Sequence, residues 1–513
     1  PDPPRQATDR RTLLRLAAAL AVPGALPRRA WSSSGWGNDP FALGVASGDP
    51  APDGFVLWTR LMPPEPGGAA GPATVRWELA HDDRFRRIVR QGTATALPEL
   101  AHSVHVELRG LEPGRWYFYR FLHGDAASPT GRTRTAPSLA DPQPHLRLAF
   151  ASCQRWEHGY YAAWNDVCRH APDLVLFLGD YIYEYASPAD PSGLARVHAL
   201  RHARTLADFR DRYALHRSDP ALQAAHAAAP WAVTWDDHEV ENDYAGLSGR
   251  EPEAAFADLR AAAYQAFYEH MPLRAAALQA GGGFGGLQLD RRLAWGRLAR
   301  LHLLDARQFR NRQACRPPGS GGAGAVRSFL GMEQERWLDA GLAEDAAPAG
   351  DGSTPRWSVI AQQTLFSPRR TPSGRQGTDS WDGYPAARER LLASLAGRAP
   401  RNTVFLGGDI HQNYVCEVRG PAPGGPILAS EFCGTSISSR AGTPQDRVDA
   451  IARLNPHVLL ARSDLRGWGL ADVTPQRWTT VLRTVDNPLR SDSACSTLAR
   501  FVVEDRRPGP VRD

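Results

Sequence analysis

Four short polar clusters each follow an apolar run in the chain, and their side chains are of the kinds that bind metal ions. The clusters are Ala151–Gln154, Gly179–Tyr185, Asp236–Asn242 and Gly407–His411. Carboxylate and amide oxygens are hard donors that suit calcium, magnesium, manganese or ferric iron, whereas His binds most transition metals. One Asp after an apolar run means little, but four such clusters predict a metal centre rather than a set of solvated loops.

The apolar runs that precede these clusters, and others like them, predict buried strands. They are Leu146–Ala151, Leu174–Leu178, Trp231–Trp235, Leu298–Leu304, Trp357–Ala361 and Val404–Leu406. They are apolar rather than alternating, which indicates burial on both faces of a sheet. Helical stretches lie between them, at Tyr160–Arg169, Ala254–His270 and Met332–Ala340. This pattern predicts a layered α/β domain with the polar clusters gathered at the strand ends.

The chain before this domain has a different pattern, with short alternating strands and Gly/Pro turns from about residue 39 to residue 135. The predicted strands are Phe55–Arg60, Val75–Leu79, Val104–Leu108 and Trp116–Phe121. Such strands over about 100 residues are typical of an all-β sandwich of immunoglobulin or fibronectin type. We therefore predict a β-sandwich over 38–138 and a catalytic α/β domain over 145–513.

The N-terminal segment 1–31 reads as an export signal. Arg10 and Arg11 stand directly before an Ala-rich apolar stretch, Leu13 to Leu26, which is the form of a twin-arginine signal. The other interpretation is a short amphipathic helix with a basic start. The signal predicts export by the twin-arginine machinery to the periplasm or the extracellular space, with an undefined cleavage point.

Composition narrows the function classes. Of the 513 residues 42% are hydrophobic and 22% charged, which are globular values and exclude wholesale disorder. No apolar run reaches the roughly 18 residues that span a bilayer, so we do not expect an integral membrane protein. All 60 basic residues are Arg, but a net charge of +5 is too dilute for stable nucleic-acid binding.

The spacing of the clusters resembles the calcineurin-like metallophosphoesterase superfamily. Gly408 to His411 has the Gly-Asp-x-His form of the closing metal motif, and Gly179-Asp180 resembles the bridging aspartate. Within that superfamily the chain looks like the PhoD-type alkaline phosphatase/phosphodiesterase family. The matching segments run in the family's order from about residue 40 to residue 470: Phe41–Pro50, Phe177–Tyr185, Trp235–Glu239, Leu304–Gln308, Trp381–Tyr384, Gly408–His411, Glu431–Ser436 and Asn455–His457.

This resemblance implies a centre that holds Fe(3+) and Ca(2+), with Mn(2+) or Zn(2+) as the alternative. Cys153 and Tyr183 match the iron ligands, and Asp180 matches the carboxylate that bridges the two metals. The remaining implied ligands are Asp237, Asn242, Asp409 and His411. The sequence does not separate Asp236 from Asp237, and Asn242 is flanked by two other oxygen donors.

The resemblance also implies a mechanism in which a metal-activated water or a bridging oxygen attacks phosphorus in line, without a protein nucleophile. His238 would hydrogen-bond the phosphoryl oxygen or the leaving group, or would instead orient a metal ligand. Arg307 is a candidate phosphate clamp, and equally an ion-pair partner for Asp305 or another carboxylate nearby. The expected substrates are phosphomonoesters and phosphodiesters, with phospholipids and cell-wall polymers among the candidates.

Three other functions remain open on the sequence. The same scaffold would serve a phospholipase D-like or nucleotide-directed phosphodiesterase. An exported binding protein with a degenerate second domain is a different class, against which the intact clusters argue. A zinc or manganese hydrolase is a third, against which Cys153 and Tyr183 argue together.

Overall fold

The computed structural model describes residues 39–62, 71–141, 145–279, 283–313, 327–348, 354–422 and 424–513. The chain divides into two compact units. The first unit comprises 1–135, 204–231 and 257–288, and the second comprises 136–203, 232–256 and 289–513. The first unit thus takes in two later segments that lie far beyond residue 138. The export segment 1–31 falls outside the described residues, and the predicted domain boundaries stay predictions.

The first unit contains two groups of antiparallel strands. The first group runs β4 (Ile88–Ala96), β3 (Ala73–Ala80), β6 (Trp116–His123) and β7 (Ala126–Ala127), with β8 (Gly131–Arg134) also on β6. The second pairs β1 (Val45–Ala51), β2 (Gly54–Arg60) and β5 (Ser103–Leu108) in that order. Phe55, Leu57, Val75 and Phe121 belong to one core that both groups share. All four strands predicted here are confirmed.

Helices follow these strands in the first unit: α3 (Leu206–Arg217), α4 (Pro220–Ala228), most of α5 (Glu253–His270) and α6 (Ala276–Gln279). The sequence pattern predicts neither α3 nor α4. In α3 the reason is visible, because Arg212, His216 and Arg217 are among its buried residues. A helix that buries cations has no apolar stripe from which to predict it.

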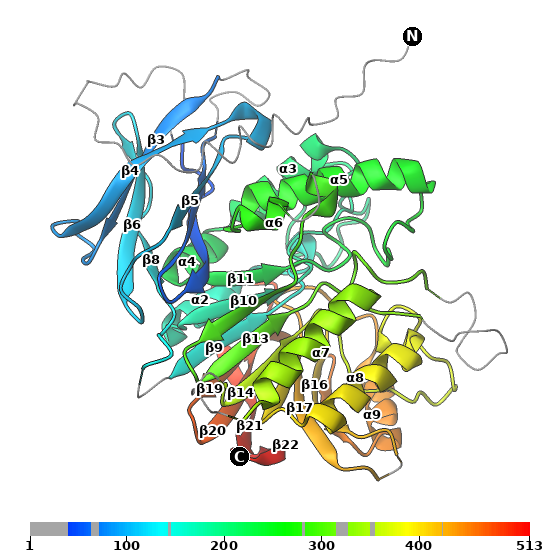
Figure 1. Ribbon diagram of the computed structural model, residues 1–513. Coiled ribbons are helices and arrows are strands. Elements are labelled where there is room, and N and C mark those ends of the chain that lie inside the picture. Colours follow the sequence, from blue (N-terminus) through cyan, green and yellow to red (C-terminus); the bar gives the residue numbers. More distant parts are fainter. Residues whose placement is uncertain are drawn as a thin grey trace. The chain divides into compact units, whose positions relative to one another are not determined.

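The second unit is built on two sheets (Figure 1). In one, the order is β22 (Arg507–Arg512), β21 (Cys495–Glu504), β20 (Arg477–Val485), β19 (Arg466–Val473), β9 (Leu146–Ala151), β10 (Leu174–Leu178) and β11 (Trp231–Thr234). In the other, it is β12 (Arg291–Trp295), β13 (Ala299–Leu303), β14 (Trp357–Ala361), β15 (Thr403–Gly407), β17 (Ile427–Cys433), β16 (Asn413–Arg419) and β18 (Val458–Arg462). β9 and β10 pair in parallel, as do β13, β14, β15 and β17, so their carboxyl ends share one edge of each sheet.

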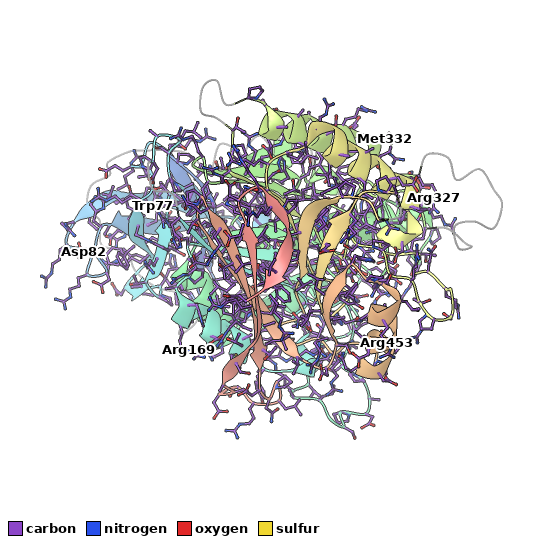
Figure 2. All side chains as sticks on the ribbon, turned by 90° about the horizontal axis from the view of Figure 1, so that it is seen from below. Trp77, Asp82, Arg169, Arg327, Met332 and Arg453 are labelled. Atoms are coloured by element: carbon purple, nitrogen blue, oxygen red, sulfur yellow. The ribbon has the colours of Figure 1, made fainter. Side chains whose placement is uncertain are left out.

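Two large apolar cores and a smaller one around Tyr414 and Val448 lie in the described part of the second unit. One includes Phe150 and Leu176 of the first sheet with Leu301 and Val359 of the second. The other large core packs the sheet that runs from β12 to β18 against α7 (Met332–Ala346) and α8 (Pro385–Arg398), which lie together in Figure 1. Met332, labelled in Figure 2, begins α7 with an exposed side chain. Two further helices are α2 (Ala162–His170) and α9 (Gln445–Leu454).

The mixed α/β fold predicted from the sequence is confirmed, and all six predicted strands exist. β9, β10 and β14 have the predicted bounds, whereas β11 stops one residue early and β13 is shorter at both ends. The third predicted helix extends to Ala346 rather than Ala340, because its last turns carry acidic residues that weaken the apolar pattern. No helix among the described residues is long and apolar enough to span a membrane.

Candidate active site

The predicted ligands stand in tight turns directly after the parallel strands of the second unit. Four of them have left-handed backbone: Cys153 (φ 60°), Asp180 (φ 59°), Asp409 (φ 64°) and His411 (φ 54°). This conformation is uncommon for residues other than glycine, and it concentrates at functional sites where the surrounding structure imposes it. These residues lie in the turns that follow the strands, so their side chains lie at the strand ends.

The two glycines of the Gly-Asp motifs are required by close packing of neighbouring turns. Gly179 has φ 101°, and a Cβ there would collide with the backbone and Cβ of Asp236. A Cβ on Gly408 would collide with the side chain of Ser152. Each glycine therefore lets its turn approach the turn of another strand, which brings the following Asp towards the other polar clusters.

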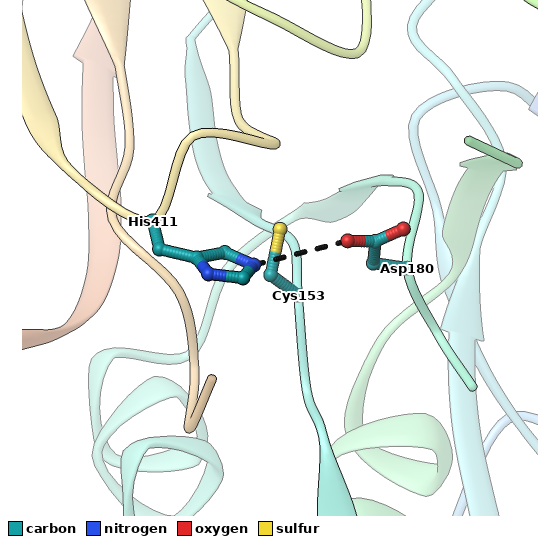
Figure 3. Close-up of side chains that lie close together, drawn as sticks. All are labelled: Cys153, Asp180 and His411. Carbon is teal, nitrogen blue, oxygen red and sulfur yellow. Dashed lines mark ion pairs between the residues drawn. The ribbon is translucent and has the colours of Figure 1, made fainter. Parts of the chain in front are cut away.

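Cys153, Asp180 and His411 form one group of potential metal ligands, with donor atoms within 4.8 Å of one another (Figure 3). His411 Nε2 lies 3.9 Å from Asp180 Oδ2. The Tyr183 hydroxyl lies between them, 2.8 Å from Asp180 Oδ2 and 3.0 Å from His411 Nε2. The hydroxyl of Ser439 donates a hydrogen bond of 2.8 Å to the Tyr183 oxygen. We call these four residues, Cys153, Asp180, Tyr183 and His411, the thiol–phenol side.

The tautomer of His411 follows from its second contact. Nδ1 lies 2.8 Å from the carbonyl oxygen of Arg440, which can only accept, so Nδ1 carries the proton. Burial lowers the pKa of His411 to about 4, so the ring is neutral near pH 7. Nε2 therefore presents a lone pair towards Asp180 and Tyr183, which is the arrangement of a metal-binding histidine whose other nitrogen is fixed by a carbonyl.

A second group joins Asp180 to Asp237 and His238, again within 4.8 Å. Nδ1 of His238 lies 2.8 Å from the buried carboxylate of Glu184, and the His238 ring centroid lies 4.2 Å from that of Tyr183. Burial disfavours a charged ring, but Glu184 and Asp237 outweigh it and raise the pKa of His238 well above its ordinary value. The carboxylates around His238 thus favour its protonated form, and Nδ1 is engaged by Glu184.

A third group contains Asp237, Asp243 and Asp379, which we call the carboxylate side. Arg307 packs against it, with Nη1 2.7 Å and Nη2 2.8 Å from the two oxygens of Asp379. Nε of Arg307 lies 2.5 Å from Asp236 Oδ1, and Nη2 lies 3.6 Å from Asp237. Arg307 is 1% exposed, so all its nitrogens are engaged inside the protein. The ion-pair partners of Arg307 are therefore these three carboxylates rather than Asp305, which accepts from its backbone N–H.

Burial and neighbouring carboxylates disfavour the ionised forms of several acidic groups in the centre. Burial and then the charge of Asp180 raise the pKa of the Cys153 thiol well above its ordinary value, with Asp409 and Asp236 adding to the effect. Burial and Asp180 also raise the pKa of the Tyr183 phenol. Burial, followed by Asp379, raises the pKa of Asp409 to about 6. These shared interactions indicate that the polar clusters from the different strands converge.

Asp237 differs from the other acids of the centre. Burial opposes its charge, but Arg307, His238 and the Asp243 backbone N–H outweigh it and hold the pKa of Asp237 below its ordinary value. The neighbouring Asp236 is bound to Arg307 and belongs to none of the three ligand groups. Asp237 therefore belongs to a ligand group and Asp236 does not, although Asp236 Oδ2 is likewise buried without a hydrogen-bond partner among the described residues.

The donors fit bound cations. Asp180 Oδ1 is buried and has no hydrogen-bond partner among the described residues. The single Tyr183 proton also faces two acceptors, Asp180 Oδ2 and His411 Nε2. A cation would satisfy this surplus of lone pairs and stabilise the ionised forms of Cys153 and Tyr183. Thiolate, phenolate, imidazole and carboxylate suit a transition metal such as ferric iron, whereas an all-oxygen set suits calcium.

Three of the predicted ligands lie outside the three groups: Tyr183, whose hydroxyl contacts Asp180 and His411, and Asn242 and Asp409. The Asn242 backbone N–H donates to Glu184, and its side chain makes no hydrogen bond within the described part of the chain. Asp409 interacts with the centre through its charge, as its effect on Cys153 indicates. Their role as ligands, like that of the whole predicted set, stays a prediction.

Several residues of the centre were not predicted from the sequence. They are Glu184, Glu239, Asp243, Asp379 and Ser439. Glu239 accepts from the backbone N–H groups of Asp180, Tyr181 and Asp236, and so ties two strand-end turns together. Glu239 could have been predicted because it lies within the polar cluster Asp236–Asn242. Asp379 and Ser439 lie in polar segments that have no distinguishing motif or spacing.

Comparison with known proteins identifies the family. Residues 148–482 match the PhoD-like phosphatase family, and residues 28–137 match its N-terminal domain. The chain is 43% identical over 488 residues to alkaline phosphatase D of Bacillus subtilis (strain 168), covering 92% of this chain and 82% of that protein. A solved structure titled "Structure of PhoD" superposes with a TM-score of 0.85 at 42% identity, covering 95% of this chain and 93% of that one. The chain belongs to the PhoD-like phosphatase family and is an enzyme of the alkaline phosphatase D type, a phosphoesterase.

Proposed function

We propose that the protein is an exported, metal-dependent phosphatase that hydrolyses phosphomonoesters and phosphodiesters. The observation that carries this proposal is the linkage of the three ligand groups, which share Asp180 and Asp237, around a buried Asp180 oxygen without a partner. A carboxylate common to two groups suits a pair of ions that act on one phosphate.

Fe(3+) is proposed for the thiol–phenol side, held by Cys153, Asp180, Tyr183 and His411. Ca(2+) is proposed for the oxygen donors around Asp237, with Asn242 and Asp409 completing the set. Bound there, the ions would neutralise the phosphate and lower the pKa of the attacking water. Mn(2+) or Zn(2+) remains the alternative if the iron assignment fails.

His238 would donate a hydrogen bond from Nε2 to a phosphoryl oxygen or to the leaving-group oxygen. Its contact with Glu184 fixes the ring and favours its charged form, which supports this role. Arg307 would act by positioning Asp236, Asp237 and Asp379 rather than by contacting phosphate, because its nitrogens already have partners. No side chain of the chain is required as a nucleophile.

We further infer the organisation and location of the protein. A twin-arginine signal over 1–31, an immunoglobulin-like sandwich over 38–138 and a metallophosphoesterase domain over 145–513 remain the proposed arrangement. Arg10 and Arg11 support export by the twin-arginine machinery to the periplasm or beyond. The match of 28–137 to a separate N-terminal domain is in line with this division.

Hydrolysis of a phosphomonoester and a phosphodiester by the purified protein, with and without calcium, tests the proposal. We expect turnover of 4-nitrophenyl phosphate and bis(4-nitrophenyl) phosphate, which a chelator abolishes and calcium restores. Undiminished turnover in metal-free protein would exclude the metal-dependent mechanism, and absence of turnover in iron- and calcium-loaded protein would favour an inactive binding protein.

A further inference from the structure

Three arginines have guanidinium groups next to residues of the centre. They differ in how many of their guanidinium nitrogens have a hydrogen-bond partner. Arg307 is buried against carboxylates, as described above. Arg466 donates from Nη1 to the carbonyl oxygen of His411 and from Nη2 to that of Ser463. Arg155 has a single side-chain hydrogen bond within the described residues, from Nε to Glu157 Oε2 at 3.4 Å. Its two terminal amino groups are thus available for an external acceptor.

The position of Arg155 is set by the thiol–phenol side itself. Its guanidinium carbon lies 5.8 Å from the ring centroid of Tyr183 and 5.1 Å from that of Tyr185. Its backbone N–H donates to the hydroxyl of Ser439, the group that donates in turn to the Tyr183 oxygen. Arg155 also stands two residues after Cys153 in the chain. The guanidinium therefore lies beside the proposed iron ligands, with its side chain 19% exposed.

Glu157 holds the Nε atom of Arg155 in place. It is 2% exposed and lies 3.2 Å from His198 Nε2 as well as 3.4 Å from Arg155 Nε. Burial disfavours its charge, but the hydrogen bond with His198 and the charge of Arg155 outweigh burial and lower the pKa of Glu157 to about 2. An anchored Nε and two aromatic faces leave the guanidinium with little rotational freedom, so binding an anion through its amino groups costs little further entropy.

We propose that Arg155 is a substrate-binding residue, whose two terminal amino groups bind the non-ester oxygens of the phosphate. A planar guanidinium matches two oxygens of a phosphate in a bidentate contact, which a lysine cannot reproduce. This inference rests on the proposed function, and it assigns to Arg155 the phosphate-clamping role that the sequence analysis considered for Arg307.

The test compares the Arg155→Met and Arg155→Lys variants with the wild type and with Arg132→Met. Met keeps much of the side-chain length against the tyrosine rings. Arg132 also lies over an aromatic ring, Trp116, but in the first unit, so its variant controls for loss of an arginine–aromatic contact. The measurements are kcat and KM for 4-nitrophenyl phosphate, the inhibition constant of inorganic phosphate, and the iron and calcium content.

We expect Arg155→Met to raise both KM and the inhibition constant of phosphate by about 10- to 100-fold, the range for a lost charged hydrogen bond. The kcat should change less, and the metal content should match the wild type. Arg155→Lys should recover part of the loss, and Arg132→Met should behave as wild type. If KM and the phosphate inhibition constant of Arg155→Met stay within twofold of wild type, or if the variant loses iron in proportion to its activity, Arg155 does not bind substrate. Failure of the wild type to hydrolyse any phosphoester would instead refute the proposed function.

Discussion

The thiol–phenol side and the carboxylate side differ in whether arginine side chains neutralise their acidic groups. On the thiol–phenol side, burial and Asp180 raise the pKa of both Cys153 and Tyr183. Arg155 lies over the ring faces of Tyr183 and Tyr185, and its Nε pairs with Glu157 rather than with an acid of the centre. On the carboxylate side, Arg307 and Arg310 already pair with Asp379. We therefore expect the proposed Fe(3+) on the thiol–phenol side to be held more tightly than the proposed Ca(2+) on the carboxylate side. The two sides should therefore respond differently to substitution and to chelation.

The largest effect is expected at Asp180, which belongs to the thiol–phenol side and also to the group with Asp237 and His238 that connects it to the carboxylate side. Asp180→Asn keeps the shape of the side chain but removes the charge, so both ions should be lost and kcat/KM should fall by about 1,000-fold or more. Metal analysis and steady-state kinetics measure the two losses. Asp492→Asn, at an exposed ion pair with Arg490, is the matched control and should retain full activity. A loss below tenfold in Asp180→Asn would show that Asp180 does not connect the two sides.

Chelation should separate the two sides without mutation. A calcium chelator should abolish hydrolysis by emptying the carboxylate side, while iron and its visible absorption remain, and calcium should restore the rate. Absorbance and activity are followed in the same sample. Parallel loss of colour and activity would show that the sides do not differ in how tightly they hold their ions.

Tyr183→Phe tests the thiol–phenol side alone. A phenolate on ferric iron absorbs visible light by charge transfer, so the variant should lose most of the colour, much of the iron and about 10- to 100-fold in rate. Tyr181→Phe and Tyr185→Phe are the matched controls and should keep the colour. Equal colour in all three variants would show that Tyr183 is not the iron ligand, whereas a colourless and iron-free wild type would make a zinc or manganese centre the better assignment.

The smallest effect is expected at Glu184, which touches neither proposed ion directly but holds His238. Glu184→Gln keeps the side-chain shape and weakens the hold on Nδ1 of His238, so kcat should fall by about 10-fold with KM and metal content nearly unchanged. Steady-state kinetics and metal analysis check this. A change confined to KM would show that His238 acts in substrate binding rather than in the chemical step.

The sequence predicted the strands of the second unit well because their physical signal is local. Leu146–Ala151 and Leu174–Leu178 are apolar on both faces, and the turns after them carry Gly-Asp and Cys where the sheet edge requires left-handed backbone. The partners of those residues could not be predicted in the same way. Asp379 pairs with Arg307 across 72 residues, and neither segment contains a pattern that specifies the other.

The roles assigned to arginines show the same limit. Arg307 lies in a segment that resembles the family, which made it a candidate phosphate ligand. Its burial among carboxylates depends on residues from separate segments of the chain, which include Asp236 and Asp379. Arg155 differs only in that its partners are ring faces and one glutamate. Which arginine keeps free amino groups is a property of packing, which composition and spacing do not encode.

The contact between Tyr183 and His411 has a consequence for the order of events during folding. Tyr183 and His411 lie 228 residues apart in the chain, yet their side chains are 3.0 Å apart. Closing a loop of that length has an entropic cost that only the finished pairing of both sheets offsets. We expect ion loading to be among the last steps of maturation, so that an iron colour developing during refolding reports completion of the second unit.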